Sequence, residues 1–216
     1  MVNSKHVLSA LSALFVLATL SACGGGGAAP ASQAGVIALP KTGQTTCYDT
    51  SVPSVAVACS TAGISPGQDG ATQTGVAEPS PRFTVDGTGA CITDNLTGLM
   101  WTRNANLPAG TGAATTGLRT WQQALAYAND LTLCGFSDWR LSNRKELRGL
   151  INYSLANNAN TLNTLGFGNV QADVYWSSSS YAGSAANVWI VDLDVGGVFA
   201  DVKSNSYYVW PVRAGQ

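Results

Sequence analysis

The sequence predicts an α+β domain, in which two helices pack on an antiparallel sheet, behind a disordered N-terminal tether. Three observations support this prediction: a strand-turn-strand pattern near the C-terminus, two helix-capping patterns in the middle of the chain, and a stretch of small residues near the N-terminus. Strands come first, then helices, then strands again, and the connections between strands are short enough for hairpins. This order favours antiparallel pairing over a parallel α/β sheet.

The terminal hairpin is the clearest of these elements. Large apolar residues alternate with other residues along positions 189–195, which is typical of a half-buried strand. Gly196 and Gly197 then interrupt the pattern, and a second alternating run covers residues 198–203. We therefore expect two antiparallel strands around a glycine-containing turn. The residues expected to point inward are Trp189, Val191 and Leu193.

Two helices are expected between the strands. Thr120 is the cap of the first, whose apolar residues recur at helical spacing until about residues 129–131. Asn143 and Glu146 have the spacing of a capping box, so a second helix begins there. Residues 152–173 are expected to form a long loop. The inner face of the second helix is expected to consist of Leu147, Leu150 and Ile151.

The globular domain is expected to span residues 82–216. It begins with a hairpin around Asp86 and Gly87, and another buried strand starts at Leu99 after a turn over residues 94–98. Its six tryptophans stand beside alternating apolar residues, which favours core packing for most of them.

Residues 1–22 resemble a bacterial signal peptide, since an apolar run too short to span a membrane follows a weakly positive start. Residues 20–23, Leu-Ser-Ala-Cys, resemble a lipoprotein lipobox, so Cys23 is expected to carry the lipid anchor. The residue that follows the cysteine is Gly24 and not an aspartate, which favours sorting to the outer membrane. We expect the domain at the cell surface, although the sequence does not distinguish this from the periplasmic face. An ordinary secretory signal with an incidental cysteine is the alternative.

The segments after the leader contain too few large apolar residues to form a hydrophobic core. Residues 23–40 are a flexible linker of glycine, alanine and serine, and residues 41–81 form a loop-rich segment. Export leads to an oxidising compartment, and the four cysteines that remain allow three pairings. We expect Cys47 to pair with Cys59, and Cys91 with Cys134, because this choice keeps the first loop local. Each bond would add roughly 3–4 kcal/mol of stability.

Composition excludes several functions. The one histidine, His6, lies in the leader, which excludes Ser-His-Asp and Cys-His catalysis and histidine-ligated zinc in the mature chain. We therefore expect a binding protein, not an enzyme. The formal charge of −1 gives no reason to expect nucleic acid as a partner. The basic residues do gather at one place, and these are Arg140, Arg144, Lys145 and Arg148.

Polar and aromatic residues flank the terminal hairpin, and such residues are typical of adaptable binding surfaces. The candidate ligand-binding residues are Tyr181, Asn187, Asp192, Asp194, Phe199, Asp201, Asn205 and Tyr207. Surface loops without a ligand are the alternative, and the basic helix around Arg144 and Arg148 is the second candidate surface. No metal or other cofactor is expected. Calcium would need several more oxygen ligands than the three aspartates supply, and solvated carboxylates explain these better.

Five segments carry a family resemblance, in this order: RFTVDGTGACITDNLTGLMWTRNA, CGFSDWRLSNRKELRGLINY, YWSSSSY, NVWIVDL and KSNSYYVWPVR. Together they resemble the Lcl C-terminal domain family, once a domain of unknown function, over about residues 80–216. The resemblance implies a C-type-lectin-like fold with paired first and last strands. The adhesin that names the family binds sulfated glycosaminoglycans, and retroelement-diversified receptors share the fold.

The resemblance thus implies adhesion to, or recognition of, an extracellular glycan or protein. A structural lipoprotein that binds another envelope component and a retroelement-diversified receptor are the alternatives. The collagen-like repeat that would make the adhesin trimeric does not precede this domain, and the sequence does not fix the oligomeric state.

Overall fold

The computed structural model describes residues 39–51, 53–61, 67–107 and 117–215. All of these described residues belong to one compact unit. The expected signal peptide, the expected lipidation site Cys23 and nearly all of the expected linker lie outside the described residues. Among the described residues, no helix has the length and apolar character needed to cross a membrane.

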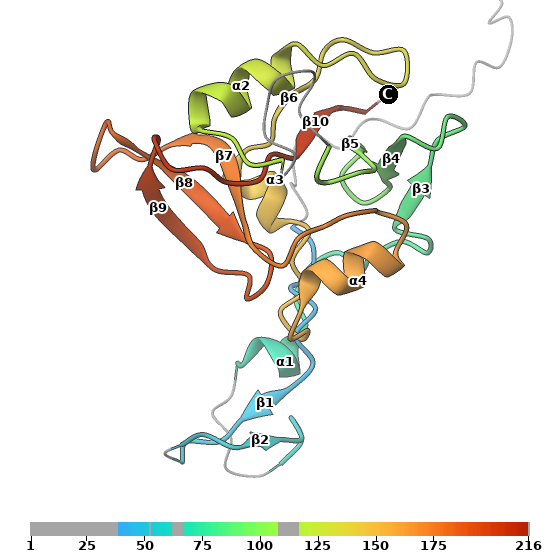
Figure 1. The fold of residues 1–216 in the computed structure, drawn as a ribbon. Coiled ribbons are helices and arrows are strands. Elements are labelled where there is room, and N and C mark those ends of the chain that lie inside the picture. The colour runs from blue at the N-terminus through green and yellow to red at the C-terminus, as the bar shows by residue number, and fades with distance from the viewer. Residues whose placement is uncertain (1–38, 52, 62–66, 108–116, 216) are drawn as a thin grey trace, which may run out of the picture. The chain divides into compact units, whose positions relative to one another are not determined.

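The described strands form three sheets in which all neighbouring strands are antiparallel (Figure 1). A two-stranded sheet contains β1 (Cys47–Tyr48) and β2 (Ala56–Val57). The five-stranded sheet consists, in spatial order, of β3 (Phe83–Val85), β4 (Cys91–Asp94), β5 (Leu99–Thr102), β10 (Pro211–Ala214) and β6 (Arg140–Leu141). The three-stranded sheet consists of β7 (Val174–Ser180), β8 (Asn187–Asp192) and β9 (Val198–Val202).

The described helices are α1 (Asp69–Thr72), α2 (Trp121–Asn129), α3 (Arg144–Arg148) and α4 (Asn158–Thr164). The predicted start of α2 is confirmed: Thr120 is its N-cap, and the Thr120 amide donates to Gln123 Oε1 at 3.0 Å. The predicted capping box of α3 is confirmed as well. Asn143 Oδ1 accepts hydrogen bonds from the amides of Lys145 and Glu146, and Glu146 Oε2 accepts one from the Asn143 amide at 2.7 Å.

Two predictions about this region were wrong. The second helix ends at Arg148 with Gly149 as its C-cap, and Leu150 and Ile151 reach the core from the chain that follows. The expected loop at residues 152–173 contains α4. Asn157 caps this helix by accepting a hydrogen bond from the Asn160 amide at 2.8 Å. Several asparagines occur in this segment, so the capping residue could not be recognised from the sequence.

The hairpins expected around Asp86 and around Gly196 are confirmed as the β3–β4 and β8–β9 pairs. The implied pairing of the first and last strands of the domain is not found. Strand β10 pairs with β5 and β6, whereas β3 pairs with β4 at the edge of the sheet. The last strand therefore closes the sheet by insertion between strands that are distant in sequence.

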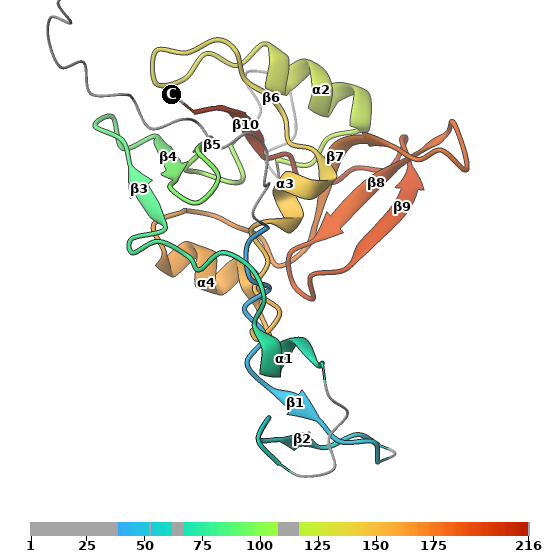
Figure 2. The same cartoon turned by 180° about the vertical axis from the view of Figure 1, so that it is seen from behind.

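Two apolar clusters form the core. In the larger cluster, the five-stranded sheet packs with α3, α4 and the buried side of β7 and β8. Its centre is aromatic: the ring centroid of Trp210 lies 5.3 Å from that of Trp101 and 5.0 Å from that of Phe167. In the smaller cluster, α2 packs against the opposite side of β7 and β8. In both views α3 lies between the two larger sheets (Figures 1 and 2).

Four tryptophans are buried, as the sequence predicted, and these are Trp101, Trp139, Trp176 and Trp210. The predicted disulfides are both present. One joins Cys47 to Cys59 across the small sheet, and the other joins Cys91 in β4 to Cys134 after α2.

Candidate ligand-binding surface

The sheet of β7, β8 and β9 is covered on both of its faces. Ile190 is 5% exposed and packs in the smaller cluster, while its neighbour Val191 is fully buried in the larger one. The expected division of the hairpin into an inner and an outer face is therefore wrong for β8. Successive side chains of β8 do alternate between the two faces of the sheet. However, α2 covers one face and α3 covers the other, so this alternation does not separate buried from exposed positions.

Trp189 was expected to point inward, and this was wrong, because it is only half-buried. It shares a face with Val191 and lies beside Arg144, the first residue of α3. Together with four other residues it lines an open hollow of about 290 Å³. We call this the α3–Trp189 surface, and its lining residues are Arg144, Lys145, Arg148, Trp189 and Val198.

An aromatic-cationic stack is the most ordered part of this surface. The Arg144 guanidinium carbon lies 4.6 Å from the ring centroid of Trp189. On Trp189 the ring of Tyr181 packs edge-on, with the centroids 5.1 Å apart and the planes at 84°. The start of α3 holds Arg144 in place, since its amide donates to Ser179 Oγ of β7 at 3.2 Å. An arginine above a tryptophan face is a stable arrangement that leaves guanidinium N–H groups for a ligand.

The cations of this surface lack carboxylate partners. Among the residues that the structure describes, no carboxylate oxygen lies within 4.0 Å of the charged nitrogens of Arg144, Lys145 or Arg148. Arg148 Nε donates instead to the Tyr153 hydroxyl at 3.0 Å. By contrast, Arg140 has a carboxylate partner: two of its nitrogens donate to the Glu146 carboxylate at 2.8 and 2.6 Å, which raises the pKa of Arg140. Positive charge is therefore available around the hollow.

A second hollow of about 400 Å³ adjoins the first, since Lys145 and Arg148 line both. Its lining is mostly apolar and consists of Leu39, Pro40, Lys41, Thr42, Lys145, Arg148, Gly149, Ile151 and Tyr153. Lys41 adds a fourth cation there. The two hollows form one continuous surface that combines positive charge with aromatic and aliphatic side chains.

The ligand residues predicted from the sequence lie in several places. Tyr181 reaches the α3–Trp189 surface, and Asn187 starts β8 on the same face. Asp192 ends β8 and Asp194 lies in the turn that follows; the Asp192 carboxylate accepts from the Asp194 amide at 2.8 Å, and Asp194 accepts from Asn157 at 3.1 Å. Phe199 is 54% exposed, but it lies opposite Ile190 on the other face of the sheet.

Asp201, Asn205 and Tyr207 form a hydrogen-bonded group on that other face. The Tyr207 hydroxyl and the Asn205 amide donate to the Asp201 carboxylate, the latter at 2.9 Å. The Tyr207 hydrogen bond is the main cause that lowers the pKa of Asp201. Burial, and then the same carboxylate, raise the pKa of Tyr207. These side chains satisfy one another, so their geometry explains a turn after β9 without a ligand.

The described carboxylates do not converge on a calcium site. Asp201 pairs with Val188 at one end of the hairpin, whereas Asp192 precedes the turn at the other end. Asp86, Cys91 and Cys134 lie close enough to share an ion, but their two sulfurs are joined as a disulfide.

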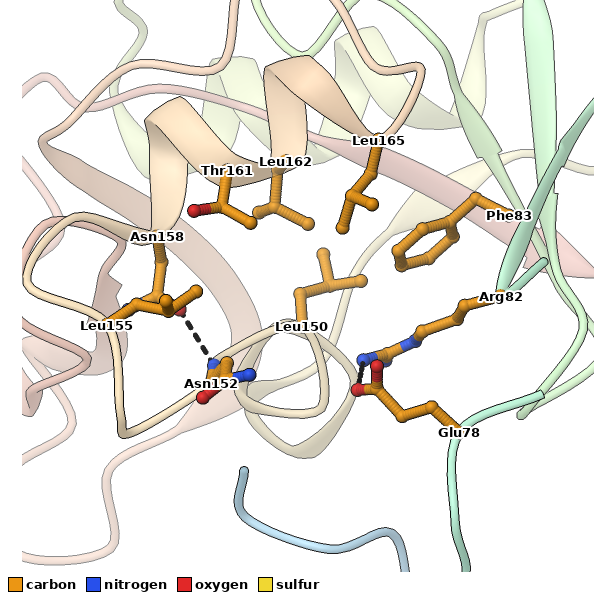
Figure 3. Close-up of a pocket in the computed structure, with 10 residues that line it drawn as sticks. All are labelled: Glu78, Arg82, Phe83, Leu150, Asn152, Leu155, Asn158, Thr161, Leu162 and Leu165. Carbon is orange, nitrogen blue, oxygen red and sulfur yellow. Dashed lines mark hydrogen bonds and ion pairs between the residues drawn. The ribbon is translucent and has the colours of Figure 1, made fainter. Parts of the chain in front are cut away.

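A small pocket lies between β3 and α4 (Figure 3). Its volume of about 30 Å³ is close to that of one water molecule, and the Leu150, Leu162 and Phe83 side chains point into it. Asn158 lies at its wall and accepts a hydrogen bond from the Asn152 amide at 2.7 Å. This pocket is a packing feature and is too small for a ligand.

A comparison with family models finds that residues 90–213 match the model described as the Lcl C-terminal domain, which is more than half of the chain. The chain belongs to the Lcl C-terminal domain family. No curated protein matches it in sequence. Arg144, Lys145, Arg148, Trp189 and Val198 all lie within the matched Lcl C-terminal domain. Sequence reasoning identified the basic residues but placed Trp189 in the core, because local patterns do not show that Arg144 at the start of α3 stacks on it.

Proposed function

We propose that this Lcl C-terminal domain is a lectin-like binding module that recognises an acidic glycan through the α3–Trp189 surface. The observation that carries the proposal is the stack of Arg144 on Trp189, beside Lys145 and Arg148, which have no carboxylate partner among the described residues. Sugar rings present C–H groups that pack against apolar side chains, here Trp189 and Val198, and sulfate or carboxylate groups bind guanidinium groups in a bidentate manner. The surface offers both kinds of contact within one hollow.

Charge balance supports an acidic ligand over a neutral one. Unpaired cations around a hollow raise the local concentration of anions and speed their association. An acidic protein is the competing ligand, but a hollow of about 290 Å³ lined by five residues suits one or two sugar units better than a broad protein interface.

The remaining parts of the proposal concern the context of the domain. The lipobox at Cys23 supports a lipid-anchored protein of the outer membrane with the domain at the cell surface. The two hairpins, the helices and the returning strand β10 support a C-type-lectin-like arrangement. The absence of histidine from the mature sequence supports binding without catalysis.

Binding of the full chain to immobilised heparin and to its desulfated counterpart tests the proposal. We expect heparin to bind and the desulfated polymer to bind much more weakly, with affinity falling as salt rises. Replacing both Arg144 and Arg148 by alanine should abolish binding. Lys203→Gln is the matched control, since it removes one cation that lies over Trp121, away from the hollow. Equal binding by the double variant and the control would place the ligand elsewhere.

A further inference from the structure

Strand β9 is an open sheet edge. It pairs with β8, and in the described residues no strand pairs with its other side. Both views show β9 as the outer strand of its sheet (Figures 1 and 2). Open edges are normally protected by proline, by lysine or by a bulge, because they can pair with another chain. The sequence of β9, Val-Phe-Ala-Asp-Val, contains neither proline nor lysine, and the carboxylate of its one charged residue, Asp201, accepts hydrogen bonds from Asn205 and Tyr207 of its own chain.

The ladder shows which backbone groups face this edge. The Asp192 amide donates to the Gly197 carbonyl at 2.9 Å, and the Lys203 amide donates to the Ala186 carbonyl at 3.0 Å. Antiparallel strands alternate between residues that bond the partner and residues that face away. The backbone groups of Phe199 and Asp201 therefore face β8. Those of Val198, Ala200 and Val202 face the open edge.

Val202 is already satisfied within its own chain. Its amide donates to Asp201 Oδ1 at 2.7 Å, and its carbonyl accepts from the Asn205 amide at 3.1 Å. At the other end, the Gly196 amide donates to the Asp192 carbonyl at 3.0 Å. Two residues, Val198 and Ala200, thus present backbone donors and acceptors that have no partner among the described residues.

We propose that a second copy of this chain pairs with β9 along this edge, antiparallel and with Phe199 opposite Phe199. In this register Val198 of each copy exchanges hydrogen bonds with Ala200 of the other, which satisfies all the free groups of both residues. A register centred on Ala200 would need the backbone of Val202, and one centred on Val198 would need the amide of Gly196. Both are occupied, so the structure favours a single register.

The side chains fit the same register. Phe199 is 54% exposed, and pairing places its ring opposite the Phe199 ring of the second copy, as in stabilising cross-strand aromatic pairs. On the other face Val198 lies beside Ala200 of the second copy. Asp201 lies opposite a glycine, Gly197, so no like charges face each other. A self-complementary edge of this kind fits a symmetric dimer better than an unrelated peptide.

The dimer would also affect ligand binding. This consequence rests on the proposed function, whereas the dimer itself does not. The two-fold axis of an antiparallel strand pair is perpendicular to the sheet, so equivalent faces lie on the same side. Trp189 lies on the face of Ala200, next to the edge, since the two residues are paired. Both α3–Trp189 surfaces would therefore face one side, and a polymeric ligand could occupy both with a gain in avidity.

Cysteine crosslinking of the full chain tests the pairing. Opposite residues that are not hydrogen-bonded to each other lie about 4.5 Å apart between Cα atoms, within the range that a disulfide spans. We expect Phe199→Cys to form a disulfide-linked dimer under mild oxidation with copper phenanthroline, seen on a non-reducing gel. Val202→Cys is the matched control: it is exposed on the same strand, but two copies would lie roughly 20 Å apart in this register.

A third variant distinguishes disulfides that form because two β9 strands pair from disulfides that form by random collision of two molecules. Ala200→Pro removes an edge-facing N–H and leaves the β8 ladder intact, so in the Phe199→Cys background it should abolish the dimer while the fold is retained. Near-ultraviolet circular dichroism of each variant checks the fold. Absence of the dimer in folded Phe199→Cys, equal crosslinking of Val202→Cys, or a dimer that survives Ala200→Pro would overturn the proposal. If the unmodified chain did not bind heparin while the Phe199→Cys dimer still formed, only the proposed function would be overturned.

Discussion

The guanidinium of Arg144 stacks on the indole of Trp189, and this contact links the first residue of α3 to the middle of β8 on the uncovered part of the sheet. Nothing in the core requires it, because Trp189 is half-buried and Arg144 has no carboxylate partner among the described residues. A residue pair of this kind is compatible with the proposed role of the surface in binding. This distinguishes it from Arg140, whose charge Glu146 already neutralises.

The first prediction concerns this pair. We expect Trp189→Ala to weaken heparin binding by about 2 kcal/mol or more, as loss of a central aromatic anchor does. A double-mutant cycle with Arg144→Ala should show coupling of about 0.5–1 kcal/mol. Trp121→Ala is the control, since Trp121 is also half-buried with Lys203 4.7 Å from its ring centroid. Surface plasmon resonance measures both. Additive effects would show that the two residues do not act together.

The second prediction concerns the disulfides. Cys91 and Cys134 are separated by 43 positions, and the chain-entropy model gives about 4 kcal/mol for closing a loop of this length. Replacing both by serine should lower the free energy of unfolding by about that amount, measured by chemical denaturation. The Cys47–Cys59 bond closes a loop of 12 positions in the small sheet, and its loss should cost the domain less. A larger loss of unfolding free energy for the Cys47–Cys59 variant than for the Cys91–Cys134 variant would mean that the stability of the whole domain depends on the small sheet.

The third prediction compares two residues of the hairpin. Leu193 is fully buried and Phe199 is 54% exposed. Leu193→Ala should cost about 2–5 kcal/mol through the cavity it leaves. Phe199→Ser should change stability by less than about 0.5 kcal/mol. Thermal and denaturant unfolding measure both, at a concentration low enough to keep the protein monomeric. Similar losses for the two variants would mean that Phe199 belongs to the folded core of the monomer.

The fourth prediction concerns the anchor. Cys23→Ser should prevent lipidation, since only a thiol accepts the diacylglycerol, and the variant should stay unprocessed or become soluble. Detergent phase partitioning measures this. A variant that still partitions with the detergent would contradict a lipid attached to Cys23.

The sequence allowed the hairpins, the capping box of Asn143 and both cysteine pairs to be predicted, because each depends on local chemistry or on very few alternatives. What could not be predicted depends on tertiary contacts. Burial of both Ile190 and Val191 requires a helix on each face of the sheet, and a period of two contains no information about that.

The candidate site was predicted only in part for the same reason. Polar and aromatic composition around the hairpin drew attention to Asp201 and Tyr207, which bind each other. Tyr181 and the basic residues of α3 were identified, but their meeting point on Trp189 depends on how α3 crosses β8. That crossing is set by packing between residues far apart in the chain, which local patterns do not report.

The fifth prediction concerns pH. Hydrogen bonds from Tyr207, and then from the Val202 amide and Asn205, lower the pKa of Asp201 in the folded protein. The unfolded chain, with a pKa of about 3.9, therefore binds more protons than the folded protein as the pH falls toward that value. The stabilising contribution of Asp201 is complete above about pH 5 and is lost as the pH falls through the lowered folded-state pKa.

Asp201→Asn should accordingly be less stable than the unmodified chain above about pH 5, and the difference should shrink on acidification below about pH 4. Urea unfolding at several pH values measures the difference, in which the contributions of all other carboxylates cancel. Tyr207→Phe removes the main cause of the shift and should show the same trend with a smaller amplitude. A difference that stays constant with pH would mean that Asp201 titrates alike in both states. One that grows on acidification would mean that its carboxylate is destabilised by the fold.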